Sequence, residues 1–198
     1  MTKIGILGNG RVGGGLATAL ARAGHDVTVA DRAPGAAAEA ARSADVVVNA
    51  TPGAGSLERL AALRDELRGK ILVDVSNATV DGPDGLPTDL LHHDSSLAEK
   101  LQRALPDTHV VKTLNTMLHS VMTAPGSLSQ PAGVFLSGED RAAKETVRGL
   151  LADLGWREEW IVDLGGVETA RATEAAVLFV PHVIRARGFR PFAVSVVT

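Results

Sequence analysis

The sequence contains no cysteine and no tyrosine, and aromatic residues make up only 3% of its 198 residues. Because cysteine is missing, the sequence excludes disulfide bonds, thiolate catalysis and metal sites with cysteine ligands. The shortage of aromatic residues accompanies a high content of alanine, glycine and arginine. We interpret it as a compositional bias rather than a functional signal.

Long hydrophobic runs and an excess of basic charge are also missing. The most apolar later segment, residues 175–184, contains a proline and a histidine and is far shorter than the roughly 20 residues that span a bilayer. The net charge of −3 provides no basic face for nucleic acid and no polybasic segment for a membrane surface. We therefore expect a soluble cytoplasmic protein that acts on a small molecule, with no nucleic-acid or membrane partner.

The N-terminal stretch combines an apolar strand with closely spaced glycines. Residues 4–7 predict a strand, and residues 16–23 predict a helix. Between them, Gly8, Gly10 and Gly13 have the spacing G-x-G-x-x-G. The order of strand, glycines and helix is the fingerprint of a dinucleotide-binding site.

Each glycine of this motif has a separate predicted role. Gly8 permits a tight turn, Gly10 lets the backbone approach a pyrophosphate, and Gly13 allows the helix to pack closely on the sheet. The backbone N–H groups at the start of the helix would then face the phosphates. The cofactor-binding residues predicted here are Gly8, Asn9, Gly10, Arg11, Val12 and Gly13.

An acidic residue follows the second predicted strand, residues 26–30. Asp31 comes 18 residues after Gly13, where a carboxylate can accept hydrogen bonds from the adenosine ribose hydroxyls. This position favours NAD over NADP, because the carboxylate would repel a 2′-phosphate. Arg32 leaves the preference open, since its guanidinium can stack on adenine or pair with that phosphate. Alternatively, Asp31 only caps the following helix.

Further apolar strands indicate a parallel sheet. Residues 46–50 are apolar apart from Asn49, as in a strand that is buried on both faces. The remaining predicted strands are residues 71–75, 109–114, 134–137 and 161–164. We predict an α/β fold with a Rossmann-type, doubly wound parallel sheet of about six to seven strands. Residues 1–198 would form a single NAD(P)-binding domain with a C-terminal helical segment over residues 167–187.

Polar residues follow several of these strands. The carboxyl ends of parallel strands meet at one edge of the sheet, which is where nucleotides bind. The candidates at this edge are Ala50, Thr51, Pro52, Asn77, Ala78, Asn115, Thr116 and Met117. His92, His93 and Asp94 lack a further group of metal ligands nearby, so we expect no metal site.

Three other segments carry predictions about packing. Residues 79–93 are rich in proline, glycine and aspartate, which favours an irregular loop. Ser95 or Ser96 is expected to cap the next helix. Lys112 lies within an apolar strand and needs an acidic partner, although a direct role at the cofactor is the alternative.

The C-terminal helix, residues 167–180, is mostly apolar in its second half. Glu168, Arg171 and Glu174 have the spacing of i, i+3 ion pairs. The apolar residues 175–180 need a cover, and a second subunit is a reasonable source.

Taken together, the motifs resemble the deazaflavin (coenzyme F420)-dependent NADP oxidoreductase family, a relative of the nucleotide-binding halves of pyrroline-5-carboxylate reductases. The resemblance covers nearly the whole chain. It rests on the glycine motif and on Asp45-Val-Val-Val-Asn-Ala-Thr-Pro52, Asp74-Val-Ser-Asn77, Ser96-Leu-Ala-Glu-Lys-Leu-Gln102 and Val110-Val-Lys-Thr-Leu-Asn-Thr116.

The resemblance implies roles for individual residues and an assembly. By similarity, the dinucleotide would contact Gly8, Asn9, Gly10, Arg11, Val12, Arg32, Thr51, Pro52, Asn77 and Ala78. Asn115, Thr116 and Met117 would lie near the nicotinamide ring, where a second ring stacks. The resemblance also implies a homodimer in which the terminal helix helps to close the substrate cleft.

The chain departs from the family pattern between Asp31 and Ala50. This region is shorter by about the length of a helix and a strand, which predicts that an edge strand beside the adenine pocket is missing. Members that bind NADP usually carry a small neutral residue in place of Asp31. Both departures leave open whether NADP or NAD is bound, and how strongly.

The resulting hypothesis is hydride transfer between NADP or NAD and a planar acceptor, with coenzyme F420 as the first choice. The absence of a catalytic triad or carboxylate pair agrees with it, because the cofactors carry the reactivity. The alternatives are a related flavin or ferric reductase, or a non-catalytic module that binds a dinucleotide and senses redox state.

Overall fold

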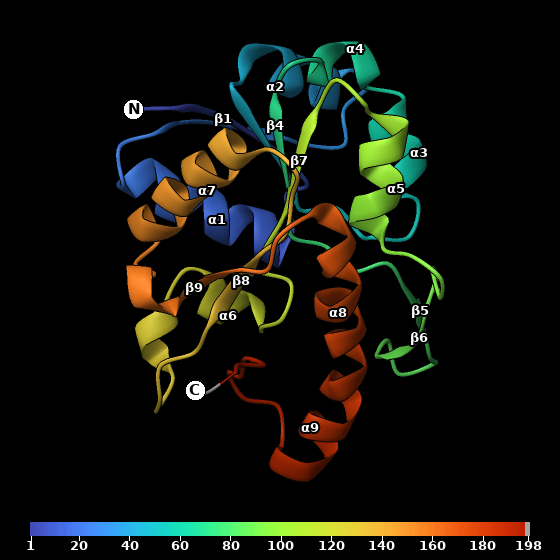
Figure 1. Ribbon diagram of the computed structural model, residues 1–198, viewed down its shortest axis with the longest axis vertical. Helices are drawn as coiled ribbons and strands as arrows, with labels where there is room; N and C mark the ends of the chain where they lie inside the picture. The colour runs from blue at the N-terminus through green and yellow to red at the C-terminus, as the bar shows by residue number, and fades with distance from the viewer. Residues whose placement is uncertain (197–198) are drawn as a thin grey trace.

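The central element is a parallel five-stranded sheet, seen in a computed structural model that describes residues 1–196 (Figure 1). The strands are β1 (Lys3–Leu7), β2 (Asp26–Ala30), β3 (Val46–Asn49), β4 (Ile71–Asp74) and β7 (His109–Lys112), in the order β2-β1-β3-β4-β7. This architecture confirms the predicted Rossmann-type α/β fold. The order reverses between β2 and β3 around β1, and such a switch point opens a crevice for ligands.

Helices cover both faces of the sheet (Figure 1). One layer holds α1 (Arg11–Arg22), α6 (His119–Met122) and α7 (Arg141–Asp153), and the other holds α2 (Ala36–Ser43), α3 (Ser56–Ala61), α4 (Arg64–Leu67) and α5 (Leu97–Ala104). Side chains of β3 alternate between the two apolar cores, with Val46 and Val48 in the first and Val47 in the second. All residues of β3 are buried, which explains its run of three valines before Asn49.

The strand β2 forms one edge of this sheet. From β2 the chain passes through α2 directly to β3 on the far side of β1. Within the described residues no further strand lies beyond β2. The short region after Asp31 therefore removes an edge strand, as the sequence predicts.

The central sheet has fewer strands than the predicted six to seven. The segments predicted as the last strands are present as β8 (Val134–Leu136) and β9 (Ile161–Asp163), but they pair with each other. A single antiparallel bridge between Lys112 and Ser137 joins them to β7. Because β8 meets β7 in the antiparallel sense, it cannot continue the parallel ladder. Short 3-10 turns, η1 (Pro125–Ser127) and η2 (Glu158–Trp160), flank this pair.

Residues 79–93 contain a hairpin, so the predicted irregular loop is wrong there. The hairpin pairs β5 (Thr79–Asp81) with β6 (Pro87–Leu90) in antiparallel register. Its turn is closed by the N–H of Gly82, which donates to the carbonyl oxygen of Leu86 at 2.8 Å. Of the proline and glycine residues that suggested irregular structure, Gly82, Pro83 and Gly85 belong to this turn and Pro87 begins β6.

The C-terminal arm, defined here as residues 167–196, begins with a helical rod. It consists of η3 (Val167–Thr169), α8 (Ala170–Ala175), η4 (Ala176–Leu178) and α9 (Phe179–Arg187), which follow one another without a break and match the predicted segment 167–187. The rod extends away from the central sheet, and the chain then folds back toward α6 (Figure 1). Among residues 1–196, no helix has both the length and the apolar character needed to cross a bilayer.

Candidate active site

The glycine motif connects β1 to the start of α1. Gly8 has a φ of +107°, and a Cβ atom on Gly13 would lie 1.8 Å from the carbonyl oxygen of Gly8. Both positions therefore require glycine for the turn and for close packing of α1. A Cβ atom on Gly10, by contrast, would have no described protein atom within 4 Å.

The N-terminus of α1 is open at Gly10. Gly10 is the N-cap, and within the described chain no side chain caps this helix end. The exposed residues Asn9, Gly10 and Arg11 and the half-buried Val12 surround it. The first N–H groups of a helix have no partner within the helix and attract anions. The uncapped helix end at Gly10 is thus of the kind that can hold the pyrophosphate of a dinucleotide.

Asp31 and Arg32 are exposed at the carboxyl end of β2. One carboxylate oxygen of Asp31, Oδ1, accepts a hydrogen bond from the N–H of Ala33 at 2.8 Å. The next helix is capped by Gly35, so Asp31 shapes the turn before α2 rather than capping the helix. Within residues 1–196, Arg32 has no ion pair.

The carboxyl ends of the central strands are joined by a buried polar network. Leu7, Asn49, Asp74 and Lys112 are aligned in register across β1, β3, β4 and β7. The side-chain amide of Asn49 donates to Asp74 Oδ1 at 2.8 Å, and Asn49 Oδ1 accepts from the hydroxyl of Thr51 at 2.6 Å. Thr51 and Ala50 are half-buried and Pro52 is exposed at the rim.

A reciprocal amide pair links the loops after β4 and β7. The amide of Asn77 donates to the carbonyl oxygen of Asn115, and the amide of Asn115 donates to Oδ1 of Asn77, both at 2.9 Å. Between Lys112 and Asn115, Leu114 has a φ of +60°, an unusual backbone conformation for a side chain of this kind. Such strain commonly occurs at functional sites. The structure therefore brings Asn77 and Asn115 together, with the buried Ala78 next to them.

The three predicted ring-positioning residues are not open to solvent. Asn115, Thr116 and Met117 are 5%, 5% and 7% exposed. Residues 192–194 of the C-terminal arm pair with this segment: the N–H of Leu118 donates to Phe192, and that of Val194 donates to Thr116. Access to these residues therefore depends on the C-terminal arm.

Lys112 has the acidic partners that the sequence predicts. Its ammonium nitrogen lies 2.8 Å from Asp74 Oδ2 and 2.9 Å from Glu174 Oε1, and it also donates to the carbonyl oxygen of Ser76. All three charged side chains are buried. Burial alone would lower the pKa of Lys112, but the two carboxylates raise it above its ordinary value. The structural pairing is thus confirmed.

Glu174 also caps α5 from a distance of 77 residues in sequence. Its two carboxylate oxygens accept hydrogen bonds from the N–H groups of Leu97 at 2.9 Å and Ala98 at 3.2 Å. A negative charge at this end of a helix is favourable. The expected cap by Ser96 is also present, since its hydroxyl accepts from the N–H of Glu99 at 3.1 Å.

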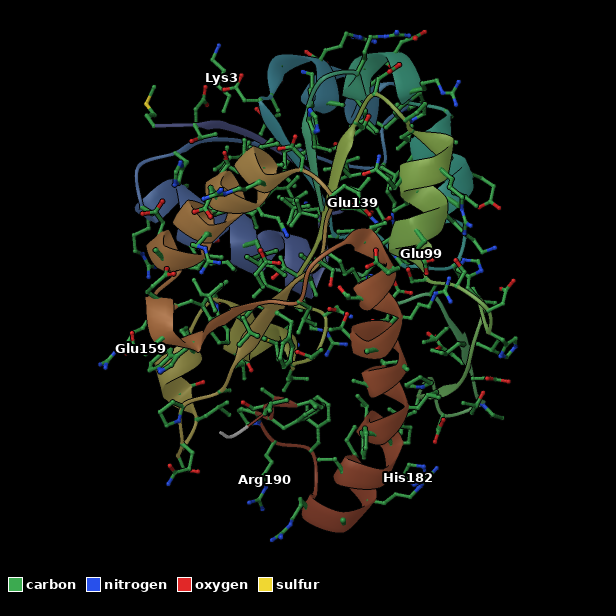
Figure 2. The ribbon with its side chains drawn as sticks, in the orientation of Figure 1. Lys3, Glu99, Glu139, Glu159, His182 and Arg190 are labelled. Atoms are coloured by element: carbon green, nitrogen blue, oxygen red, sulfur yellow. The ribbon has the colours of Figure 1, made fainter. Side chains whose placement is uncertain are left out.

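The predicted i, i+3 ion pairs within the terminal helix are wrong. Arg171 instead binds Glu99 on α5 through two hydrogen bonds of 2.7 Å, and Glu174 turns toward Lys112. Figure 2 shows Glu99 between α5 and the rod. The Arg171 guanidinium lowers the pKa of Glu99 to about 2. Arg171 pairs with Glu99 rather than with Glu168 or Glu174 on its own helix, because two parallel hydrogen bonds to one carboxylate are stronger than a single ion-pair contact.

The histidines after the hairpin contribute no visible ligand cluster. His92 is half-buried, and burial together with nearby Lys100 lowers its pKa. Among residues 1–196, no group of three or more histidine, aspartate or glutamate side chains is placed to hold a metal ion.

Asn49, Asp74 and Glu174 are polar residues at this site that the sequence analysis did not predict as site residues. The first two are signalled by polar side chains at the ends of apolar strands. Glu174 carries no comparable local signal, since its partners lie on β7 and α5.

Comparisons with known proteins agree with this geometry. Residues 3–81 match the model of the 3-hydroxyacyl-CoA dehydrogenase NAD-binding domain. A protein from Arthrobacter sp. FB24, provisionally designated an F420-dependent NADP-reductase, has a crystal structure that superposes with a TM-score of 0.91; it is 38% identical, with 100% of both chains covered.

Two curated relatives are longer than this chain. The F420-dependent NADP reductase of Methanocaldococcus jannaschii is 31% identical over 141 residues, which cover 69% of this chain and 60% of that protein. Metalloreductase STEAP3 of Rattus norvegicus is 32% identical over 188 residues, covering 89% of this chain and 36% of that protein. The resemblance noted in the sequence is thereby confirmed, and the chain belongs to the F420-dependent NADP reductase family of NAD(P)-dependent oxidoreductases.

Proposed function

We propose that the protein is an enzyme that transfers a hydride between NADP or NAD and a planar acceptor, with coenzyme F420 as the first candidate. The observation that carries the proposal is the uncapped N-terminus of α1 at Gly10, in a chain 38% identical over its full length to a protein designated an F420-dependent NADP-reductase. The uncapped helix end supports dinucleotide binding, and the similarity supports the choice of acceptor.

The residues at the carboxyl edge fit a dinucleotide. The N–H groups at the start of α1, from Asn9 to Val12, would hold the pyrophosphate, and the free oxygen of Asp31 would accept from the ribose. The pair of Asn77 and Asn115 would fix the loops beside the nicotinamide. When bound, the reduced nicotinamide supplies two electrons as a hydride, which the acceptor takes up together with a proton. Because no general acid or base is needed for the hydride itself, the main tasks of the chain are orientation and exclusion of water.

A second candidate is reduction of a flavin or ferric complex. The similarity to metalloreductase STEAP3 over 89% of this chain favours this alternative. The same dinucleotide site would serve it. A flavin would accept the hydride as F420 does, whereas a ferric complex accepts one electron at a time, so two ferric ions would have to be reduced for each nicotinamide oxidised.

Oxidation of NADPH and NADH, followed at the nicotinamide absorbance band with F420, flavin and ferric acceptors, tests these candidates. We expect turnover with F420 and little with the other acceptors. Turnover confined to flavin or ferric complexes would select the second candidate. Tight dinucleotide binding without turnover on any acceptor would contradict an enzymatic role and favour the redox-sensing module.

Replacing Asp31 with serine should shift the preference toward NADP. The substitution removes a negative charge where a 2′-phosphate would lie, and it leaves Arg32 to pair with that phosphate. We expect the ratio of Kd values for NADP and NAD to fall by about tenfold, the equivalent of about 1.4 kcal/mol. Titrations of the natural protein and of Asp31→Ser with NADP and with NAD measure this ratio. Much tighter binding of NADP than NAD by the unsubstituted protein would show the inference from Asp31 to be wrong.

We further infer a homodimer. The apolar residues 175–180 are only partly covered within one chain, and Phe179 is 60% exposed. Such an apolar surface on the rod is a reasonable subunit contact.

A further inference from the structure

We propose that residues 192–195 form a strap over the acceptor side of the site, and that this strap must open to admit the acceptor. This inference rests on the proposed hydride transfer. It assigns a gating role to a segment that lies outside the nucleotide-binding core.

The strap is held mainly by backbone hydrogen bonds. The N–H of Leu118 donates to the carbonyl oxygen of Phe192 at 3.0 Å, and the N–H of Val194 donates to Thr116 at 2.9 Å. Farther along, the N–H of Gly133 donates to the hydroxyl of Ser195 at 2.8 Å. Met117 and Ala193 therefore lie directly opposite each other as an antiparallel pair without hydrogen bonds between them.

The strap covers the residues implied to contact the rings. Asn115, Thr116 and Met117 are at most 7% exposed in this conformation. A planar acceptor has to approach the nicotinamide to about 3–3.5 Å for transfer. A ring cannot stack against Met117 while Ala193 lies against it, so the strap and the acceptor compete for this segment.

The C-terminal arm has a second attachment, and the two differ greatly in strength. Glu174 at the base of the rod is buried against Lys112 and α5. Separating that ion pair would leave uncompensated charges in the core. The strap, by contrast, is a short edge pairing formed by half-buried residues, and such pairings belong to the parts of a protein that open first. The arm should therefore open at the strap while α8 stays in place.

Gly188 provides a pivot between the rod and the strap. It ends α9 with φ +75° and ψ 170°, a backbone conformation that is essentially restricted to glycine. Rotation at this position would move residues 189–196 and leave the rod unchanged. The geometry thus contains a fixed base, a pivot and a releasable end.

A disulfide across the strap tests the proposal. In the variant Met117→Cys/Ala193→Cys the paired Cα atoms are expected about 4.5 Å apart, which lies within the range of disulfides. Because the natural chain has no cysteine, no other disulfide can form within it. We expect oxidation to lower kcat/KM for F420 by at least about 50-fold relative to the same protein in dithiothreitol. The disulfide would hold the strap closed, so the open conformation that admits the acceptor would no longer be populated. The Kd for NADPH should change less than about twofold, and the Ala193→Cys variant should not respond to oxidation. Equal activity of the oxidised and reduced forms would overturn the proposal that the strap must open.

Hydrogen exchange gives a readout that does not depend on turnover. The amides of Leu118 and Val194, which are the donors of the strap, should exchange at least about 100-fold faster than the amides of β3. Adding F420 together with NADP should reduce their protection further. Strap amides as protected as β3 would overturn the proposal even if the introduced thiols impaired the double variant. Turnover on no acceptor, with fast exchange of these amides, would refute the hydride-transfer function but not the opening of the strap.

Discussion

The variant Gly10→Ala should lose dinucleotide binding and keep its fold. The added Cβ would meet no described protein atom within 4 Å, and Gly10 has an extended backbone that alanine can adopt. The new methyl group would instead occupy the space through which a pyrophosphate approaches the N–H groups of α1. We expect the Kd for NADPH to rise by at least about 100-fold, or about 2.7 kcal/mol, in fluorescence or calorimetric titrations. The thermal midpoint should shift by less than about 3 °C.

Two neighbouring glycines serve as controls for this result. A Cβ atom on Gly15 also meets no described atom within 4 Å, and Gly15→Ala should stabilise α1 by up to about 1 kcal/mol without weakening binding. On Gly13 the Cβ would lie 1.8 Å from the carbonyl oxygen of Gly8, so Gly13→Ala should destabilise the fold by about 3 kcal/mol. If Gly10→Ala bound NADPH as tightly as the natural protein, the proposed phosphate-binding site at Gly10 would be wrong.

The variant Lys112→Met should destabilise the protein by about 3–5 kcal/mol, because it leaves Asp74 and Glu174 buried without their cation. Denaturant unfolding at pH 7 measures this loss. Lys3→Met, at an exposed position on β1, should change the stability by no more than about 0.5 kcal/mol. Adding Asp74→Asn and Glu174→Gln to Lys112→Met should restore part of the stability, since the uncompensated charges are removed.

The stability contributed by Lys112 should also depend on pH in a defined direction. Its pKa is raised in the folded protein, so the ion pairs contribute fully below the ordinary lysine pKa of 10.5. This contribution is lost as the pH rises through the higher folded value. The contribution of Lys112 to the stability difference between the natural protein and Lys112→Met should therefore stay constant from pH 7 to pH 9 and shrink only above about pH 10.5. A stability of Lys112→Met equal to that of the natural protein at pH 7 would show that the cluster is not charged.

The parts of the fold that sequence predicts best are those with local patterns. The glycine spacing after an apolar strand located β1, the turn and α1, and the mostly apolar residues 46–50 located a buried strand. The turn residues near Gly82 misled the prediction because they signal a break in the chain without saying whether strands flank it. The pairing of β8 with β9 was hidden because strand partners are set by packing rather than by propensity.

The candidate site was predictable only where the strand ends converge. Asn77 and Asn115 follow β4 and β7 and meet as expected for residues at one edge of a parallel sheet. The partners of Arg171 and Lys112 were only partly predictable. Lys112 required an acid by charge alone, but helical spacing pointed Arg171 to its own helix. Its true partner, Glu99, lies 72 residues away.

The edge position of β2 bears on how the affinity for a dinucleotide would be distributed along the proposed ligand. With no further strand beside β2 in the described chain, the adenosine of a dinucleotide bound as proposed would lie at the edge of the sheet. Most of the binding free energy should then come from the phosphates, and free adenosine should be a poor competitor. On the proposed binding mode, the choice between the two nicotinamide cofactors would then depend largely on the exposed side chains of Asp31 and Arg32, and a single substitution should alter it.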